Sequence, residues 1–277
     1  MKLEKITAWL DKTLKVADFD DVSNNGLQVE RDQGSGIRDR GSGIRDQGSG
    51  IRDQGSGIRD QGSGIRDQGS GIRDQVKVVA FAVDASVKSV RAAAKAGAQL
   101  LVVHHGISWG GGIRRISGGV YNVVRAAMDA NLALYACHLP LDAHPTLGNN
   151  AQLAKLLGLR KVRPAFSYHG NVIGLVGESV RRQSMAIGSR RFDFEPGLIG
   201  VCSGGAGEFA EEAKRLGCDL YLTGEASWGD VIAAENCGMK MICAGHYETE
   251  VFGVRAVAGA MKRALKLKTI DLTEELK

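Results

Sequence analysis

Cysteine is scarce in this sequence, and no two cysteines have the spacing of a redox or metal-binding pair. The five cysteines form an odd number and contain no C-x-x-C motif. They lie in or beside apolar runs, at positions Cys137, Cys202, Cys218, Cys237 and Cys243. This pattern argues against a disulfide framework and favours reduced thiols, so we expect a cytoplasmic protein.

Long apolar runs are also missing. Residues 1–16 predict an amphipathic helix whose apolar face carries Leu3, Ile6, Trp9, Leu10 and Leu14. Charged residues separate these positions, and no continuous apolar stretch is present. We therefore expect neither a signal peptide nor a membrane span.

Charge of one sign does not dominate either. The formal net charge is +5, but Lys and Arg are scattered among acidic residues, and no run pairs them with aromatic residues. A nucleic-acid partner is therefore not expected. The 277 residues, 43% of them hydrophobic, suffice for one large α/β domain or two small ones.

The most unusual segment is a tandem repeat. Residues 31–72 contain six copies of Arg-Asp-Gln-Gly-Ser-Gly-Ile, with Arg40 replacing Gln in the second copy, and residues 73–75 begin a seventh. Two glycines per copy disfavour a helix, and the odd period turns successive isoleucines to opposite faces of a strand. We expect residues 31–75 to form a low-complexity, flexible insertion. A partner-binding or adhesive element is the alternative.

The segments that flank the repeat, residues 26–30 and 76–83, both predict strands. The repeat would then be an overgrown hairpin loop between them. The cost of closing such a loop grows only logarithmically with its length, so a fold can tolerate it.

Beyond the repeat, strand-like apolar runs alternate with helical patterns, which is typical of parallel α/β sheets. Strands are predicted at residues 78–83, 99–103 and 132–137, with helices at 86–96 and 121–131. The same order recurs later, with strands at 198–202, 219–223 and 239–244 and helices at 208–216 and 230–237.

The two runs also match in sequence. Residues 94–101 align with 213–221, and Ser-Trp-Gly occurs at both 108–110 and 227–229. Each run ends with a histidine followed four residues later by an acid, first His138 and Asp142, then His246 and Glu250. We infer an internal duplication. Chance similarity between alanine-rich helices is the alternative.

The predicted fold is α/β, with two similar halves, three layers and mostly parallel or mixed sheets. Residues 1–30 and 76–164 would form the first half and residues 165–250 the second. Residues 251–277 would form a C-terminal helix that packs on the first half.

The first candidate site residues are two adjacent histidines. His104 and His105 directly follow the predicted strand 99–103, and ligands gather at such carboxyl ends of parallel strands. Neighbouring residues within a strand point to opposite faces. Both histidines can share a site only if the strand has ended and the chain bends, as Gly106 would allow. Otherwise one is a ligand or a core residue and the other faces solvent.

Two acids and a further histidine complete a set that suits two metal ions, because ions close together repel unless a carboxylate bridges them. Asp142 lies between Pro140 and Pro145, which we expect to forbid a helix and hold a rigid loop. Capping of the helix near residue 149 is its alternative role. A helix that begins near His246 would place His246 and Glu250 on one face, a common spacing that also suits metal binding.

The glycine-rich segment 202–208 joins a predicted strand to a predicted helix. Its amides could cradle a phosphate, or its glycines could serve only a tight turn. Cys202 and Ser203 have no base nearby in sequence, so nucleophilic catalysis is disfavoured. His169 is expected at the surface.

Several of these motifs occur together and in order. They are Asn25-Gly26-Leu27-Gln28, His104-His105-Gly106, the His138/Asp142 spacing followed by Gly148-Asn149-Asn150, Ser203 to Gly207, Thr223-Gly224-Glu225, and the His246/Glu250 spacing. In this, the chain resembles the Ngg-interacting-factor-three-like family, whose members are often labelled GTP cyclohydrolase type two homologues. The resemblance covers the chain outside the repeat.

The resemblance implies a homohexameric ring and a site for two divalent ions, zinc, iron or manganese, between two α/β halves. The metal ligands would be His104, His105, Asp142, His246 and Glu250, with Glu250 as the bridge. His138 and Glu225 would lie near the ions as catalytic or substrate-facing groups.

Two functions are compatible with this sequence. The first is a metal-dependent hydrolase that acts on a nucleotide-like small molecule, by a GTP cyclohydrolase-type reaction or by phosphoester hydrolysis, with His138 or Glu225 transferring the proton. The second is a non-catalytic metal-binding factor that acts through protein partners.

Overall fold

The computed structural model describes residues 1–32 and 75–277, so the predicted flexible repeat lies almost entirely outside the described residues. The elements discussed below belong to one compact unit, Met1–Arg31 with Val76–Lys277. Among the described helices, none is long and apolar enough to cross a bilayer.

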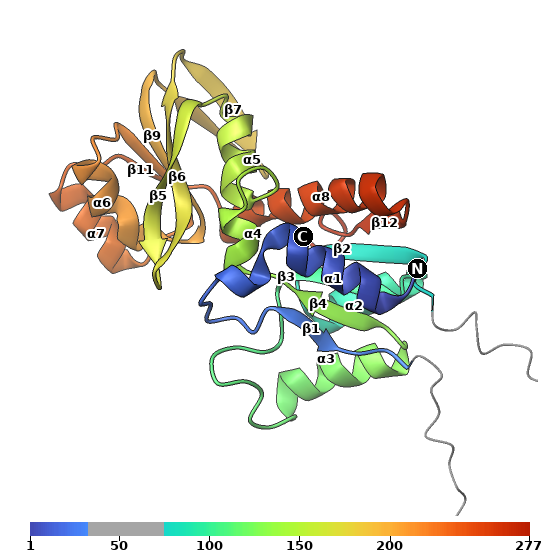
Figure 1. Cartoon of the computed structure of the whole chain (residues 1–277). Helices are drawn as coiled ribbons and strands as arrows, with labels where there is room; N and C mark the ends of the chain where they lie inside the picture. Colours follow the sequence, from blue (N-terminus) through green and yellow to red (C-terminus); the bar gives the residue numbers. More distant parts are fainter. Residues whose placement is uncertain (33–74) are drawn as a thin grey trace, which may run out of the picture. The chain divides into compact units, whose positions relative to one another are not determined.

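The first sheet has five strands in the order β1-β4-β3-β2-β12 (Figure 1). All neighbours are parallel except β1, which runs antiparallel to β4 at the sheet edge. The strands span Gly26–Val29 (β1), Ala133–Ala136 (β4), Leu100–His105 (β3), Val78–Asp84 (β2) and Lys268–Asp271 (β12).

The hairpin predicted around the repeat is wrong. Strands β1 and β2 flank the repeat but are separated by β4 and β3 within the sheet. Gly26 of β1 pairs with Ala136 of β4. Both edges of β2 are already hydrogen-bonded to β3 and β12, so β1 has no place beside it.

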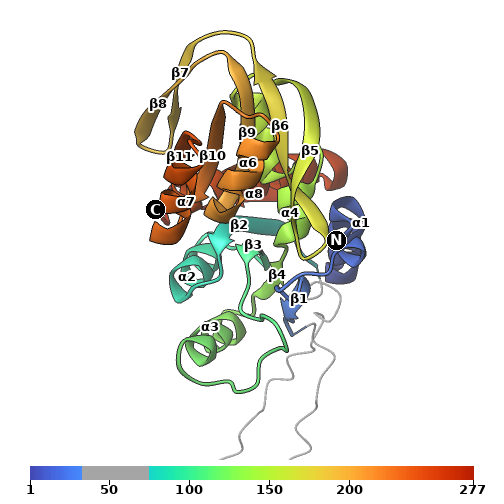
Figure 2. The same ribbon diagram turned by 90° about the vertical axis from the view of Figure 1, so that its left-hand side faces the viewer.

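Helices cover both faces of the first sheet. Alternation along β2 sends Val79, Phe81 and Val83 to one face, where they pack with the apolar sides of α1 and α8. Ala80 and Ala82 point to the other face, toward helices α2 and α3. Figure 2 shows α1 on one side of this sheet and α2 and α3 on the other. These helices span Leu3–Leu14 (α1), Val87–Lys95 (α2), Gly118–Asp129 (α3) and His246–Leu265 (α8).

Helix α1 forms where the sequence predicted it. Leu3, Ile6, Leu10 and Leu14 recur at helical spacing and are all at most 2% exposed. Full burial of an aliphatic side chain of this size contributes about 1.5–3 kcal/mol. The apolar stripe therefore anchors the N-terminal segment that leads into the site.

The second sheet has the order β11-β10-β9-β6-β5. Strands β9, β10 and β11 are parallel, whereas β6 and β5 are antiparallel additions. A separate hairpin, β7–β8, follows β6. These strands span Arg160–Tyr168 (β5), Asn171–Ser179 (β6), Gln183–Ile187 (β7), Arg190–Phe194 (β8), Gly197–Gly205 (β9), Leu220–Glu225 (β10) and Met241–Cys243 (β11).

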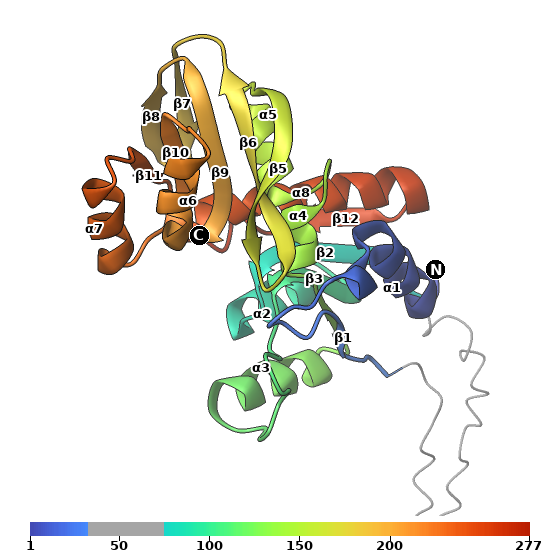
Figure 3. The ribbon, with the colours of Figure 1, turned by 60° about the vertical axis from the view of Figure 1, so that its left-hand side comes forward.

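The second sheet also has helices on both faces. Residues of α6 (Ala210–Arg215) and α7 (Trp228–Asn236) pack on one face with Tyr221. Helix α5 (Asn149–Leu156) packs on the other face with Leu222. Helix α8 contacts strands of both sheets, and Figures 1 and 3 show it passing from one to the other.

The fold is therefore mixed α/β, as predicted. Three parallel strands occur in the same order in both sheets, β2-β3-β4 and β9-β10-β11. The internal duplication and the boundaries of the two halves stay predictions. Strand β5 begins at Arg160, before the predicted boundary of the second half, and α8 runs without a break across the boundary predicted at residue 250.

Candidate metal centre

Glu250 lies at the centre of a cluster of histidines and acids. Its Oε1 is 3.2 Å from Nε2 of His246, as the predicted i, i+4 spacing requires, and 3.4 Å from Nε2 of His104. Its Oε2 is 3.3 Å from Nε2 of His105. One carboxylate thus meets three imidazoles that come from β3 and from the first turn of α8.

The predicted strand end before His104 is wrong, because β3 continues through His105. His105 still pairs with Asp84 of β2. Both histidines nevertheless reach Glu250, and their ring centroids lie 4.6 Å apart. His104 and His105 can both contact Glu250 because they lie at the carboxyl end of β3, where side chains from either face of the strand can turn toward the same carboxylate.

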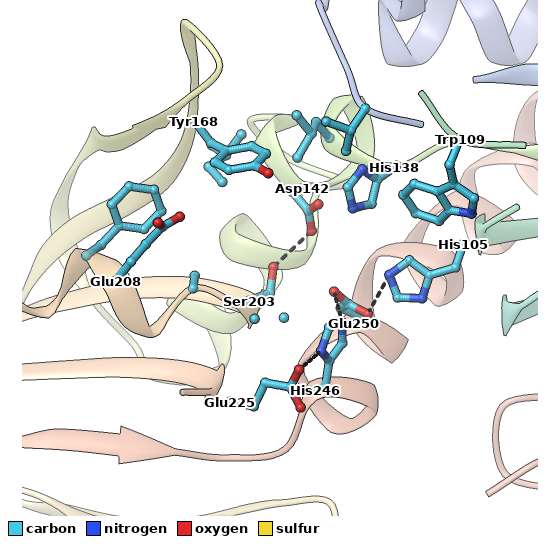
Figure 4. A pocket seen from close by; sticks show the side chains of 17 residues that line it. His105, Trp109, His138, Asp142, Tyr168, Ser203, Glu208, Glu225, His246 and Glu250 are labelled. Atoms are coloured by element: carbon cyan, nitrogen blue, oxygen red, sulfur yellow. Dashed lines mark hydrogen bonds and ion pairs between the residues drawn. The ribbon is translucent and has the colours of Figure 1, made fainter. Parts of the chain in front are cut away.

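Asp142 also belongs to the cluster, with Oδ2 at 3.5 Å from Nε2 of His104. The prolines around it do not forbid a helix, contrary to the prediction. Asp142 lies in a short helix, α4 (Leu139–Ala143), with Pro140 in its first turn. A proline is tolerated there because backbone N–H groups of the first turn have no partner within the helix. Its other oxygen, Oδ1 of Asp142, accepts a hydrogen bond from Ser203 Oγ at 2.9 Å (Figure 4). The same oxygen accepts a second one from Asn149 Nδ2 at 2.8 Å.

Every histidine of the cluster is held by its Nδ1. These nitrogens contact Cys137 O at 3.0 Å for His104, Asp84 Oδ1 at 2.8 Å for His105, Asp21 Oδ1 at 2.9 Å for His138, and Glu225 Oε1 at 2.8 Å for His246. Carbonyl or carboxylate partners of this kind orient ligating histidines in metal sites, because they fix the tautomer and leave Nε2 free to bind.

Two buried atoms at the centre have no hydrogen-bond partner among the described residues, namely Nε2 of His104 and Oε2 of Glu250. Such orphaned groups are costly unless an unseen ligand satisfies them. Tetrahedral ligands about 2.1 Å from an ion lie about 3.4 Å apart. The observed contacts between carboxylate oxygens and imidazole nitrogens, 3.2–3.5 Å, match that spacing.

The electrostatics are consistent with a site for cations. Burial by itself would lower the pKa of His104, but the charges of Asp142 and Glu250 outweigh it and raise this pKa to about 10. Contact with Glu250 raises the pKa of His246 to about 9. Burial would raise the pKa of Glu250, yet the neighbouring His104 holds it well below its ordinary range. The negative charges of Asp142 and Glu250 therefore stabilise positive charge on the neighbouring imidazoles.

Within the described residues, three groups of side chains could each hold a metal ion, with ligand atoms no more than 4.8 Å apart. They are His104 with Asp142 and Glu250, His105 with His246 and Glu250, and His104 with His105 and His138. All five residues expected as ligands are brought together, and His138 joins them. Glu225 contacts Nδ1 of His246 but belongs to none of the three groups. His169 is exposed, as predicted, in the turn between β5 and β6.

The glycine-rich segment fits a tight turn better than a phosphate cradle. The amides of Ser203, Gly204 and Ala206 already donate to side chains, those of Asn150, Thr249 and Thr223 respectively. Gly204 has φ +67°, and a Cβ there would lie 2.3 Å from Glu250 Oε1. A glycine is thus needed where the chain passes the central carboxylate.

Asp21 is a residue that the sequence analysis missed. Its side chain is only 2% exposed. It accepts hydrogen bonds from the amides of Ser23 and Leu139 and from the side chain of Asn25, besides its contact with His138. Burial would raise the pKa of Asp21, but His138 and the hydrogen bonds from Ser23 and Asn25 lower it overall. Asn25 also accepts from the amide of His138. The Asn25 to Gln28 motif was the only sequence signal for this neighbourhood.

The cluster opens into a cavity of about 390 Å³ (Figure 4). Its walls are formed by residues from both sheets and their loops, including His105, Trp109, His138, Asp142, Tyr168, Ser203, Glu208, Phe209, Glu225, His246 and Glu250. This volume lies within the range of small-molecule sites. A ligand in the cavity would therefore touch the histidine and carboxylate cluster directly.

The chain is similar to known proteins along almost all of its length. Two proteins named GTP cyclohydrolase 1 type 2 homolog are similar to the chain. The one from Deinococcus radiodurans is 40% identical, over 94% of this chain and 88% of the relative. The one from Pyrococcus horikoshii is 34% identical, over 98% and 97%. A solved structure of protein ybgI is 26% identical and covers 99% of this chain and 98% of that one, with a TM-score of 0.73.

A family model described as Duf34/NIF3 (NGG1p interacting factor 3) matches residues 68–275. This match spans most of the chain and includes every residue of the three candidate ligand groups, whereas Asp21 lies outside it. Together with the relatives, it shows that the chain belongs to the Duf34/NIF3 family.

Proposed function

We propose that this chain is a dinuclear metal protein that hydrolyses a nucleotide-like small molecule. His104 and Asp142 would hold one ion, His105 and His246 the other, and Glu250 would be shared by both. The observation that carries the proposal is that Glu250 belongs to two of the candidate ligand groups. Mixed nitrogen and oxygen ligands suit zinc, iron and manganese.

When bound, such ions lower the pKa of water and polarise a carbonyl or phosphoryl oxygen. In this proposal, His138 would transfer the proton. Its Nδ1 is tied to the buried side chain of Asp21, so that Nε2 remains to exchange a proton with water or with a leaving group. Glu225 lines the same cavity and contacts Nδ1 of His246, so it would be the second candidate for this role.

The names of the relatives support this reading, since they refer to a hydrolytic reaction of GTP. The family description instead names an interacting factor, which favours the second candidate, a metal-binding protein that acts through partners. The ring-shaped homohexamer stays a prediction, and the mass of the protein in solution would test it.

Removal and return of metal should separate the two candidates. Protein stripped with a chelator is expected to be inactive against GTP and a panel of phosphoesters, and reloading with zinc, manganese or iron should restore turnover of at least one of them. His105→Ala, measured alongside, should lower both metal content and turnover. Metal-loaded protein that turns over none of these compounds would sink the enzyme hypothesis and favour the partner-binding one.

His138→Ala should separate the proton-transfer role from a ligand role. Loss of a positioned acid or base costs about 100- to 10,000-fold in turnover. We expect turnover to fall in this range while the metal content, measured by elemental analysis, is unchanged. Lys155→Ala, at an exposed position of α5 outside the cluster and the cavity, is the control and should change neither. Loss of an ion from His138→Ala would instead make His138 a ligand, as its place in the third group allows.

A further inference from the structure

The cavity has a second end, away from the cluster around Glu250. Figure 4 shows Tyr168 and Glu208 on the opposite side of the cavity from His105 and Trp109. Tyr168 is the last residue of β5, and Glu208 lies in the 3-10 turn η2 (Gly207–Phe209) after β9. Phe209 and Ile173, each 8% exposed, form the apolar wall beside them.

Glu208 differs from the other carboxylates of the cavity. Asp142, Glu225 and Glu250 each contact a histidine or an amide. Glu208 is exposed, and its side chain forms no hydrogen bond or ion pair with any described residue. The Tyr168 ring packs edge-on against His169, but its hydroxyl has no hydrogen bond among the described residues. The far end of the cavity thus presents a carboxylate and a hydroxyl that are free to bind a ligand.

The charge of the lining decides which part of a ligand can lie there. No Lys or Arg is among the described residues that line the cavity. A phosphate at the far end would face Glu208 with no cation to offset the repulsion. A carboxylate instead accepts hydrogen bonds, and its two oxygens suit a pair of adjacent N–H donors.

The apolar wall favours a flat ring. Phe209 packs against Phe166 with ring centroids 5.7 Å apart, which holds its position, and the Tyr168 ring stands nearby in the same wall. Aromatic surfaces of this kind stack on heterocyclic bases at small cost in ordering.

We propose that Glu208 is the specificity-determining residue of this cavity, and that it accepts two adjacent N–H donors from the edge of a planar nitrogen heterocycle such as guanine. The inference rests on the proposed function for the reacting end, which would then face Glu250 and His138. It predicts that an edge with two adjacent donors is bound better than an edge with one.

Binding of guanosine and inosine tests this directly, because inosine lacks the exocyclic amino group that provides the second donor. Affinities would be measured by calorimetry on zinc-loaded protein freed of excess ion. Guanosine should bind about tenfold more tightly than inosine, the effect of one hydrogen bond to a charged acceptor. Glu208→Gln should bring the ratio of the two affinities close to one. Its amide NH2 group is a donor and cannot accept a hydrogen bond from a second N–H of the ligand.

Glu211→Gln is the matched control. Glu211 is an exposed glutamate three residues further on, in α6, and does not line the cavity. Its variant should keep the preference for guanosine. An unchanged ratio in Glu208→Gln, or the absence of binding by either nucleoside, would overturn the inference.

These outcomes are separate from those of the proposed function. Metal-dependent turnover of some compound, with no role for Glu208 in nucleoside binding, would leave the hydrolase standing and remove this inference. Preference for guanosine that depends on Glu208, without turnover of any compound, would do the reverse.

Discussion

Glu250→Gln should cost the protein its affinity for both metal ions. The substitution keeps the size of the side chain but removes the charge, and it puts an amide nitrogen in place of an oxygen that faces an imidazole nitrogen. Loss of a group that only orients a metal ligand costs about 10- to 100-fold in affinity. Loss of a shared ligand should exceed about 100-fold for each ion. Elemental analysis after dialysis would measure the metal content.

The stability of the loaded protein should report the same loss. An ion present at about 100 times its dissociation constant stabilises the folded state by about 2.7 kcal/mol. Glu250→Gln should therefore unfold at the same temperature with and without added metal, whereas the unchanged protein should gain stability on loading.

Glu248→Gln is the control for this experiment. Glu248 lies two residues earlier in the same helix and pairs with Lys277 at 3.3 Å, outside the candidate ligand groups. It should bind metal as the unchanged protein does. A Glu250→Gln variant that retained both ions would refute the assignment of Glu250 as the shared ligand.

Gly204→Ala should have the second large effect, because it combines two costs. Its φ of +67° lies in a region that alanine adopts with strain of about 1–3 kcal/mol. The new Cβ would also meet Glu250 Oε1 at 2.3 Å, so the central carboxylate would have to move. We expect a lower free energy of unfolding, measured with denaturant, together with weakened metal binding.

Gly217→Ala separates these two costs. Gly217 has φ +81°, but a Cβ there would meet no atom within 4 Å. It should therefore lose stability alone and keep its metal content. Equal metal content in both variants would mean that the position of Glu250 does not depend on Gly204.

The repeating strands and helices could be predicted because their side chains are patterned by burial. Strand β2 and helix α1 both carry regular apolar positions and formed as expected. No elements were predicted between residues 160 and 194, where β5 to β8 lie. The first five residues of β5 are exposed, and β7 and β8 each bury only their last residue. Strand pairing, and not an apolar pattern, defines β5, β7 and β8, whereas β6 does place Ile173 and Val176 in the core.

For the candidate site, the sequence by itself determined the residue types and one local geometry. The i, i+4 spacing of His246 and Glu250 puts both on one face of α8, because helix geometry depends only on neighbouring residues. The resemblance of its ordered motifs to a known family predicted the remaining ligands.

Only the tertiary structure decided how those residues meet. Two adjacent histidines of a strand share Glu250 because α8 crosses the carboxyl end of β3, and Asp21 holds His138 because α1 anchors the segment that carries it. The placement of the strands that flank the repeat was likewise decided by β4, β3 and β12. Contacts between residues far apart in sequence depend on packing and on strand order, which no local pattern specifies.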